Sequence, residues 1–374
     1  MRRILKYFLW VFVSAAFLLF ALAFFSTDMF RQFGAKPSGA RLAKLKASKL
    51  YDGKALQNPS EYGPNDMGPY LAMMKDYLFG GEQREPKKQI QTVALDLQAL
   101  SQKKSDGIRF AWIGHSTVLL DIDGVRLLTD PMLSPRCSPS SLFGPKRFHE
   151  VKVPDEIFET LDAVILSHDH FDHLDLKTIE RLADFSTPFY VPLGVGAHLE
   201  FWGIKPERIH EHDWGDSSTF AVDRLTLIST PARHFSGRAI TRNQTLWSSW
   251  VIKSPSHSIY FSGDSGYHGG FREIGAQYGP FDLSMIEMSA YSEKYWPTLH
   301  MWPEQAVQAH QDVSAEIMLP IHWGTFNLAL HAWNEPPERL VRAADSAGVE
   351  IVTPRPGQLV DLDLLPEQEF WWRD

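Results

Sequence analysis

Ser167-His168-Asp169-His170-Phe171-Asp172-His173 places three imidazoles and two carboxylates within seven residues. The apolar run 161–166 before it predicts a buried strand, and apolar side chains at helical spacing over 175–183 predict an amphipathic helix after it. The stretch therefore forms a strand-to-helix loop, where a rigid scaffold presents side chains to a cleft. Imidazole and carboxylate suit zinc, iron or manganese. Crowded together they would repel one another without a cation between them, so we interpret the stretch as a metal-binding loop.

The whole-chain composition is that of a globular protein. The 374 residues are 44% hydrophobic and 22% charged, which is enough for one large catalytic domain with an extension or for two modest domains. The net charge of −8 provides no basic surface for nucleic acid, so we expect no nucleic-acid partner. Cys137 is the single cysteine, which excludes an intrachain disulfide and a metal site built from thiolates.

The N-terminus has the pattern of a targeting segment. Arg2, Arg3 and Lys6 precede an apolar run over 7–25, close to the roughly 20 residues that cross a bilayer. We expect residues 1–26 to form a transmembrane anchor that places the catalytic domain on the periplasmic or extracytoplasmic side. A cleaved signal peptide is the alternative, because residues 21–23 resemble a small-x-small cleavage site.

The remaining chain divides into a lead-in and a catalytic domain. Residues 27–105 are poorly periodic and rich in turn residues. Residues 106–365 open with alternating apolar residues around the Asp123-Gly124 turn, which predicts an antiparallel meander. Strand pairs then alternate with helices, which indicates sheets packed together with helices outside them.

Three further ligand candidates each follow an apolar strand: His234, Asp264 and His322. If those strands end at one edge, each delivers one side chain there. The expected ligand sets are then His168, His170 and His234 for one metal, and Asp172, His173 and His322 for a second, with Asp264 bridging the two. Such a site keeps two ions about 3.5–4 Å apart.

At this point the chain resembles the metallo-β-lactamase superfamily, whose pattern is His-x-His-x-Asp-His followed by distant His, Asp and His. The resemblance implies an αββα sandwich and two zinc ions per chain. Further motifs resemble the N-acylphosphatidylethanolamine-hydrolysing phospholipase D family, over most of 110–340. They are Trp112-Ile-Gly-His-Ser-Thr117, Leu128-Thr-Asp-Pro131, Thr230-Pro-Ala-Arg-His-Phe-Ser-Gly-Arg238, Leu246-Trp-Ser-Ser-Trp250, Gly263-Asp-Ser-Gly-Tyr267, Gly279-Pro-Phe-Asp-Leu283 and Ile321-His-Trp-Gly-Thr-Phe326.

This second resemblance implies that a metal-bridging hydroxide cleaves the headgroup phosphodiester of N-acylphosphatidylethanolamine or a related phospholipid, releasing phosphatidic acid and N-acylethanolamine. Asp172 and Asp264 would act in catalysis as ligands. Asp130 matches an aspartate near the metals, and His300 matches a histidine close to the substrate phosphate. Trp302 departs from the pattern, because the animal enzymes carry an acidic residue there, and this leaves the headgroup preference open.

The partners implied are a phospholipid and a membrane, and a homodimer is compatible with the sequence. Alternative functions are hydrolysis of a soluble phosphate ester or lactone by the same fold, and a non-catalytic envelope protein. Seven intact ligands argue against the latter, because a structural zinc site closes with four. His115 is expected to be structural, Arg233 and Arg238 to meet phosphate or form surface ion pairs, and Trp296 and Trp302 to line an acyl groove or join the core.

Overall fold

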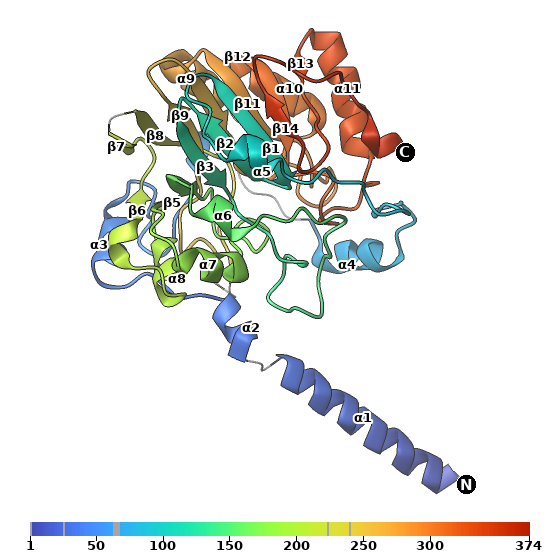
Figure 1. The fold of residues 1–374 in the computed structure, drawn as a ribbon. Helices are drawn as coiled ribbons and strands as arrows, with labels where there is room; N and C mark the ends of the chain where they lie inside the picture. The colour runs from blue at the N-terminus through green and yellow to red at the C-terminus, as the bar shows by residue number, and fades with distance from the viewer. Residues whose placement is uncertain (1, 25–26, 63–67, 223, 239–240) are drawn as a thin grey trace.

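The chain folds around two seven-stranded sheets in a computed structural model that describes residues 2–24, 27–62, 68–222, 224–238 and 241–374. The strand order is β14-β1-β2-β3-β4-β5-β6 in the first sheet and β13-β12-β11-β10-β9-β8-β7 in the second (Figure 1). The first sheet contains β1 (Ile108–Gly114), β2 (Thr117–Ile122), β3 (Val125–Thr129), β4 (Ala163–Ile165), β5 (Phe189–Pro192), β6 (Ile209–His212) and β14 (Leu359–Asp361). The second contains β7 (Ser217–Phe220), β8 (Leu225–Thr230), β9 (Ser249–Lys253), β10 (Ser258–Phe261), β11 (Phe281–Glu287), β12 (Ala315–Ile321) and β13 (Glu350–Ile351).

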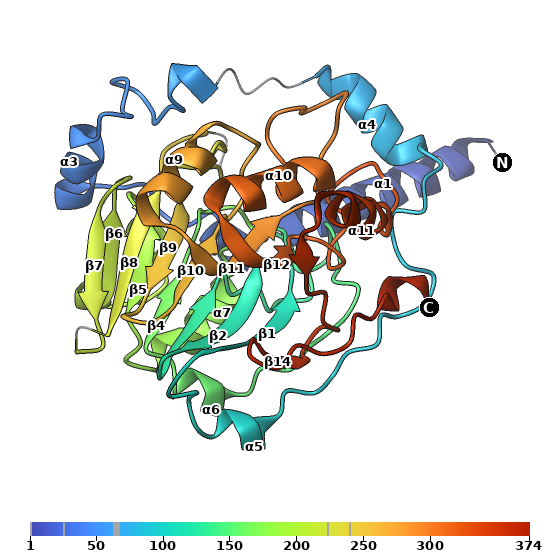
Figure 2. The same cartoon turned by 90° about the horizontal axis from the view of Figure 1, so that it is seen from above.

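Helices lie outside the two sheets, and some of them cover the outer faces of the sheets. They are α1 (Arg2–Phe24), α2 (Thr27–Gln32), α3 (Gly39–Ala47), α4 (Tyr70–Phe79), α5 (Leu97–Leu100), α6 (Asp155–Phe158), α7 (Leu176–Ala183), α8 (Gly196–Phe201), α9 (Gly270–Tyr278), α10 (Pro303–Val313) and α11 (Glu335–Ala347). Figure 2 shows α9, α10 and α11 on one side of the paired sheets and α5 and α6 on the other. The predicted αββα sandwich is confirmed.

The period-two pattern of β1 explains why the first sheet is buried on both faces. Phe110 and Trp112 join the core between the sheets, where they meet the side chains of the second sheet. Ala111 and Ile113 point the other way, into the core beneath α6, α7 and α8. Because side chains alternate across a strand, one apolar run fills two hydrophobic layers.

Strand direction brings the candidate site residues to one edge. In the first sheet β1 and β3 are both antiparallel to β2, and β3 is parallel to β4, so β1, β3 and β4 run the same way. In the second sheet β8, β10, β11 and β12 share one direction, since β9 is antiparallel to both β8 and β10. The loops that follow these strands therefore meet at a common edge.

The N-terminal helix α1 extends away from the sandwich (Figure 1) and exposes apolar side chains such as Phe8, Trp10 and Phe12. Within the described ranges, no helix has both the length and the apolarity needed to cross a membrane. The expected transmembrane anchor is therefore not confirmed, and residues 1, 25 and 26 of that predicted segment lie outside the described residues.

The lead-in, residues 27–105, packs along the catalytic domain through polar contacts. Arg41 pairs with Glu200 and with Glu211, each at 3.0 Å. Asn58 donates from Nδ2 to the carbonyl oxygen of His234 at 2.8 Å, and so reaches the backbone of a predicted ligand. The lead-in therefore helps to hold the edge at which the candidate site lies.

Candidate metal centre

The loop between β4 and α7 is fixed at both ends by buried polar groups. Asp175 caps α7 by accepting hydrogen bonds from the backbone of Lys177 and Thr178. Arg238 donates to the carbonyl oxygens of Asp169 at 2.9 Å and Leu174 at 2.7 Å. Because Arg238 is buried behind this loop, the expected contact with phosphate or surface carboxylate is wrong for this residue, which instead holds the loop in shape.

Four predicted ligands form the first group of donors: His168, His170, His234 and Asp264. One donor atom from each lies within 4.8 Å of all the others. His168 Nε2 is 2.8 Å from His170 Nδ1, which is 3.3 Å from His234 Nε2. The side chains come from the β4–α7 loop, from the loop after β8 and from the loop after β10, as the shared strand direction requires.

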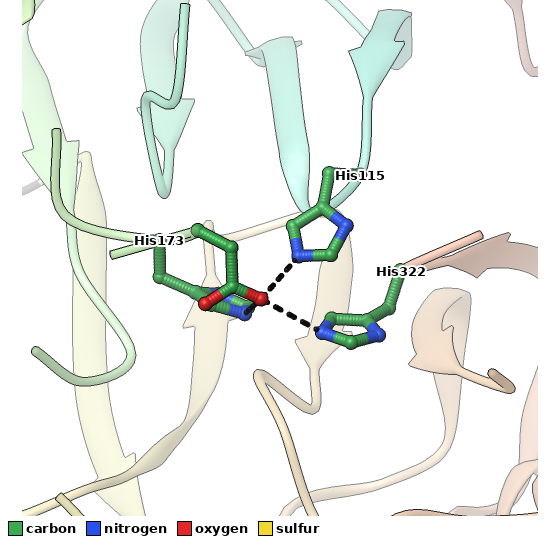
Figure 3. Close-up of side chains that lie close together, drawn as sticks. His115, His173 and His322 are labelled. Atoms are coloured by element: carbon green, nitrogen blue, oxygen red, sulfur yellow. Dashed lines mark hydrogen bonds and ion pairs between the residues drawn. The ribbon is translucent and has the colours of Figure 1, made fainter. Parts of the chain in front are cut away.

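The second group contains His115, Asp172, His173 and His322, again with donor atoms within 4.8 Å of one another. Figure 3 shows the three imidazoles around a carboxylate. Asp172 Oδ2 lies 3.4 Å from the Nε2 atoms of both His173 and His322. His115 was expected to be structural only, but its Nε2 lies 2.8 Å from the same oxygen.

Asp264 joins the two groups. Its Oδ2 is 3.0 Å from His322 Nε2 and 3.1 Å from His173 Nε2 in the second group, and 3.7 Å from His234 Nε2 and 3.8 Å from His168 Nε2 in the first. The structure thus brings all seven predicted ligands together, with Asp264 between the two sets.

Hydrogen bonds on the far side of three imidazoles select the nitrogen that faces the centre. His173 Nδ1 lies 2.7 Å from Asp130 Oδ2, and His234 Nδ1 donates to the carbonyl oxygen of Leu299 at 3.1 Å. Ser167 Oγ donates to Asp130 at 2.5 Å and therefore accepts from His168 Nδ1 at 2.9 Å. Each of these rings consequently presents Nε2 inward, which is how histidine ligands are oriented for a metal.

The centre is built for a cation. Asp264 Oδ1 and Oδ2 and the Nε2 atoms of His173 and His322 are buried without a hydrogen-bond partner among the described residues. Burial would lower the pKa of His322, yet the negative charge of Asp264 and the nearby carboxylates of Asp172 and Glu287 raise that pKa to about 10. These buried acceptor atoms converge on one point. The negative charge around them favours a cation there, which fits a bound metal.

His300 lies beside these groups, with Glu287 behind it. His300 Nδ1 is 3.3 Å from Glu287 Oε1 and 4.0 Å from Asp264 Oδ2. Glu287 is fully buried at the end of β11 and accepts a hydrogen bond from the backbone of Met301 at 3.0 Å. Burial raises the pKa of Glu287. Glu287 was not predicted from the sequence. The signal that would have identified it is its position at the end of β11, a strand that runs in the same direction as the other strands that carry site residues.

A cavity of about 220 Å³ opens onto both groups of donors. Beside His170, Asp172, Asp264, His300 and His322, its walls are the apolar residues Phe235, Ala290, Trp296, Leu299 and Leu328. Trp302 lies outside this lining and packs near Tyr291 and Arg339. Of the two tryptophans proposed for a groove, only Trp296 therefore faces the site.

Asp169 lies in the same loop but points away from the centre. Its carboxylate accepts from the Gly237 backbone at 2.8 Å and lies 3.3 Å from His198 Nε2. Burial would raise the pKa of Asp169, but the hydrogen bond with His198 and the surrounding positive charges lower it to about 2. Asp169 thus stabilises the loop rather than the candidate ligands.

We expect Asp169→Asn to lower the free energy of unfolding at pH 7 by about 2 kcal/mol, because the depressed pKa stabilises the fold by that order. Since the folded pKa lies below the unfolded value, this stabilisation is present above about pH 4 and is lost as the pH falls towards 2. Urea unfolding of both proteins from pH 7 downward measures it. An equal difference at every pH would contradict the electrostatic origin.

Residues 125–323 match the family model of the β-lactamase superfamily domain. The chain belongs to this superfamily. It is a metallohydrolase of the β-lactamase fold, and the suspected family resemblance is confirmed. The two-sheet sandwich and the donor groups at its edge agree with this membership.

Three relatives illustrate the range of similar proteins. An uncharacterised protein of Mycobacterium tuberculosis is 50% identical over 276 residues, covering 72% of this chain and 73% of that protein. The N-acyl-phosphatidylethanolamine-hydrolyzing phospholipase D 1 of Caenorhabditis elegans is 34% identical over 251 residues, covering 64% and 70%. A metal-dependent hydrolase of Methanopyrus kandleri is 26% identical over 260 residues, covering 67% and 98%.

Solved structures agree with the fold. An isothiocyanate hydrolase from Delia radicum gut bacteria superposes with a TM-score of 0.54 at 21% identity, covering 67% of this chain and 98% of that one. The metallohydrolase Igni18 of Ignicoccus hospitalis gives a TM-score of 0.53 at 20% identity, covering 68% and 97%. At this identity the likeness concerns the fold alone.

Proposed function

We propose that the protein is a di-zinc phosphodiesterase that cleaves the headgroup of N-acylphosphatidylethanolamine or a related phospholipid. The observation that carries the proposal is the pair of donor groups sharing Asp264, with His300 and an apolar cavity beside them. The likeness to the Caenorhabditis elegans phospholipase supports the substrate class.

One ion would be held by His168, His170 and His234, and a second by Asp172, His173 and His322, with Asp264 facing both. Imidazole and carboxylate without thiolate is a donor set that zinc accepts. Bound zinc lowers the pKa of water towards neutrality and neutralises charge on phosphoryl oxygens. Asp130 keeps His173 in the tautomer that such binding requires.

The chemical step joins the oxygen of water to phosphorus and breaks the bond between phosphorus and the ethanolamine oxygen. The leaving alkoxide needs a proton, and His300 is placed to supply it, because its ring borders the cavity while Nδ1 faces Glu287. Phosphatidic acid and N-acylethanolamine are the products.

The size and lining of the cavity favour a lipid. At about 220 Å³ it is smaller than the roughly 300–1,000 Å³ typical of sites that enclose a drug-sized ligand. A phosphodiester fits there. The acyl chains would extend past Phe235, Trp296 and Leu328 into an apolar phase outside the protein. Apart from the predicted ligands and His300, the walls carry apolar and aromatic side chains, which offer few polar partners to a soluble sugar phosphate or lactone.

Exposed apolar residues of α4 would provide that outside contact. Leu71, Leu78 and Phe79 of α4 are 84%, 64% and 79% exposed. Asp76 of the same helix pairs with Lys294 at 2.8 Å and with the Tyr295 hydroxyl at 2.5 Å, which ties α4 to the segment that carries Trp296. We extend the proposal to a lipid surface that α4 touches.

In Figures 1 and 2, α4 lies on the same side of the molecule as α1, whose apolar side chains are also exposed. We propose that both helices associate with one membrane and that the catalytic domain works on its periplasmic or extracytoplasmic side. A homodimer on that surface remains compatible with this arrangement.

Replacing Leu78 and Phe79 together by Ser is expected to lower kcat/KM on phospholipid vesicles roughly tenfold or more, because burying each side chain in lipid stabilises binding by about 1.5–3 kcal/mol. Turnover of a short-chain, water-soluble phosphodiester should stay unchanged. Val222→Ser in the β7–β8 turn, where the residue is 93% exposed, is the control. Equal losses on both substrates would remove the lipid-contact role of α4.

The proposed function itself is tested by headgroup release from N-acylphosphatidylethanolamine vesicles, with wild type and His322→Ala compared alongside a metal count. We expect phosphatidic acid and N-acylethanolamine from the wild type only, with about two zinc ions per chain. Two ions without lipid turnover would refute the lipid substrate and favour a soluble ester or lactone.

A further inference from the structure

His115 contacts two ligands of the second donor group in different ways. Its Nε2 lies 2.8 Å from Asp172 Oδ2, and its carbonyl oxygen accepts the backbone N–H of His322 at 2.9 Å. We propose that His115 is a positioning residue for the second metal, holding Asp172 through its side chain and His322 through its backbone, and so setting the affinity of that position alone.

The second donor set has four members without His115. They are Asp172, His173, His322 and Asp264, and four is the number of donors that a tetrahedral zinc ion takes. The 2.8 Å between His115 Nε2 and Asp172 Oδ2 is the length of an N–H···O hydrogen bond. We therefore assign His115 to fixing the carboxylate from outside the ligand set.

The backbone of His115 is held as firmly as its side chain. Its φ of 56° is left-handed, a conformation that is uncommon outside glycine, and His322 likewise has a φ of 68°. Trp112 Nε1 donates to the His115 carbonyl oxygen at 2.8 Å, and the His115 amide donates to Thr325 Oγ1 at 2.7 Å. These bonds tie the β1–β2 turn of the first sheet to the end of β12 in the second.

The position of His115 limits its influence to one metal position. Its ring neighbours among the described residues are His173, His322 and Phe326, with the His322 ring centroid 4.0 Å away. His168, His170 and His234 of the first group are not among these ring neighbours within the described part of the chain. Loss of a hydrogen-bond partner of a metal ligand typically weakens metal affinity 10- to 100-fold.

The matched variants are His115→Asn and His115→Gln. Asparagine tolerates the left-handed backbone but is too short to reach Asp172, whereas the amide nitrogen of glutamine falls near the position of Nε2. Zinc titration of each metal-free protein by calorimetry gives two affinities, and cobalt spectra report the second ion's surroundings. Neither readout uses a substrate, so the outcome is independent of the proposed lipid activity.

We expect His115→Asn to weaken the second affinity 10- to 100-fold with the first unchanged, and His115→Gln to recover most of that loss. Unchanged affinities in His115→Asn would overturn the proposal. So would equal weakening of both positions in the two variants, which indicates a role in folding. One nitrogen fewer around the second metal in His115→Asn, measured by X-ray absorption, would make His115 a ligand and equally overturn it.

Discussion

Asp264→Asn is expected to leave the protein with less than half of its metal and to lower kcat/KM at least about 10³-fold, equivalent to about 4 kcal/mol of transition-state stabilisation. Asp264 Oδ2 lies within 4 Å of donors from both groups, at 3.0 Å from His322 and 3.7 Å from His234. The amide removes the negative charge and turns an N–H₂ group towards nitrogens that must offer lone pairs.

Asp169→Asn is the matched control for that experiment. Asp169 is also a buried aspartate near the centre, but it contacts Gly237 and His198 instead of the ligands. It should lose stability and keep its metal, whereas Asp264→Asn should lose metal first. Zinc content, measured after dialysis, separates the two effects. Full metal content and turnover in Asp264→Asn would end the role of Asp264 as the carboxylate shared by both groups.

The ligands could be predicted from the sequence because each follows a short apolar strand. Strand direction then carries His168, His234, Asp264 and His322 to one edge, and the parallel pairings of β10, β11 and β12 provide the physical reason. The αββα sandwich followed from the same alternation. Residue types and spacing were sufficient for this part, since an imidazole cluster after a strand has few structural explanations.

The residues that hold the predicted ligands in place were harder to predict from the sequence. His115 lies in the turn Gly114-His115-Ser116-Thr117, and Glu287 lies between Ile286 and Met288. Neither neighbourhood along the chain says which distant side chain the residue meets. Arg238 lies four residues after His234, yet it faces the back of the metal loop through the carbonyl oxygens of Asp169 and Leu174. Contacts of this kind depend on how two sheets pack, and local patterns do not encode that packing.

His300→Gln is expected to lower kcat on a phospholipid about 10²- to 10⁴-fold while both metals stay bound, because a positioned general acid contributes that range. Its ring centroid lies 5.1 Å from those of His234 and His322, so His300 is near the ligands without being in either predicted set. His310→Asn is the control, since His310 is buried in α10 and contacts Ser284. Loss of zinc from His300→Gln would contradict a role in proton transfer and indicate a ligand.

The dependence of kcat on the leaving group distinguishes two roles for His300, proton donation and charge stabilisation. If His300 protonates the departing alkoxide, a phosphodiester with a p-nitrophenolate leaving group needs no proton, and the loss in His300→Gln should shrink to a few-fold. If His300 instead stabilises charge on the phosphoryl oxygens, the loss should be similar for both leaving groups. Glu287→Gln refines the answer, because Glu287 Oε1 lies 3.3 Å from His300 Nδ1 and orients the ring. If Glu287 orients His300 as the general acid, Glu287→Gln should lower kcat less than His300→Gln does. The loss should depend on the leaving group in the same way.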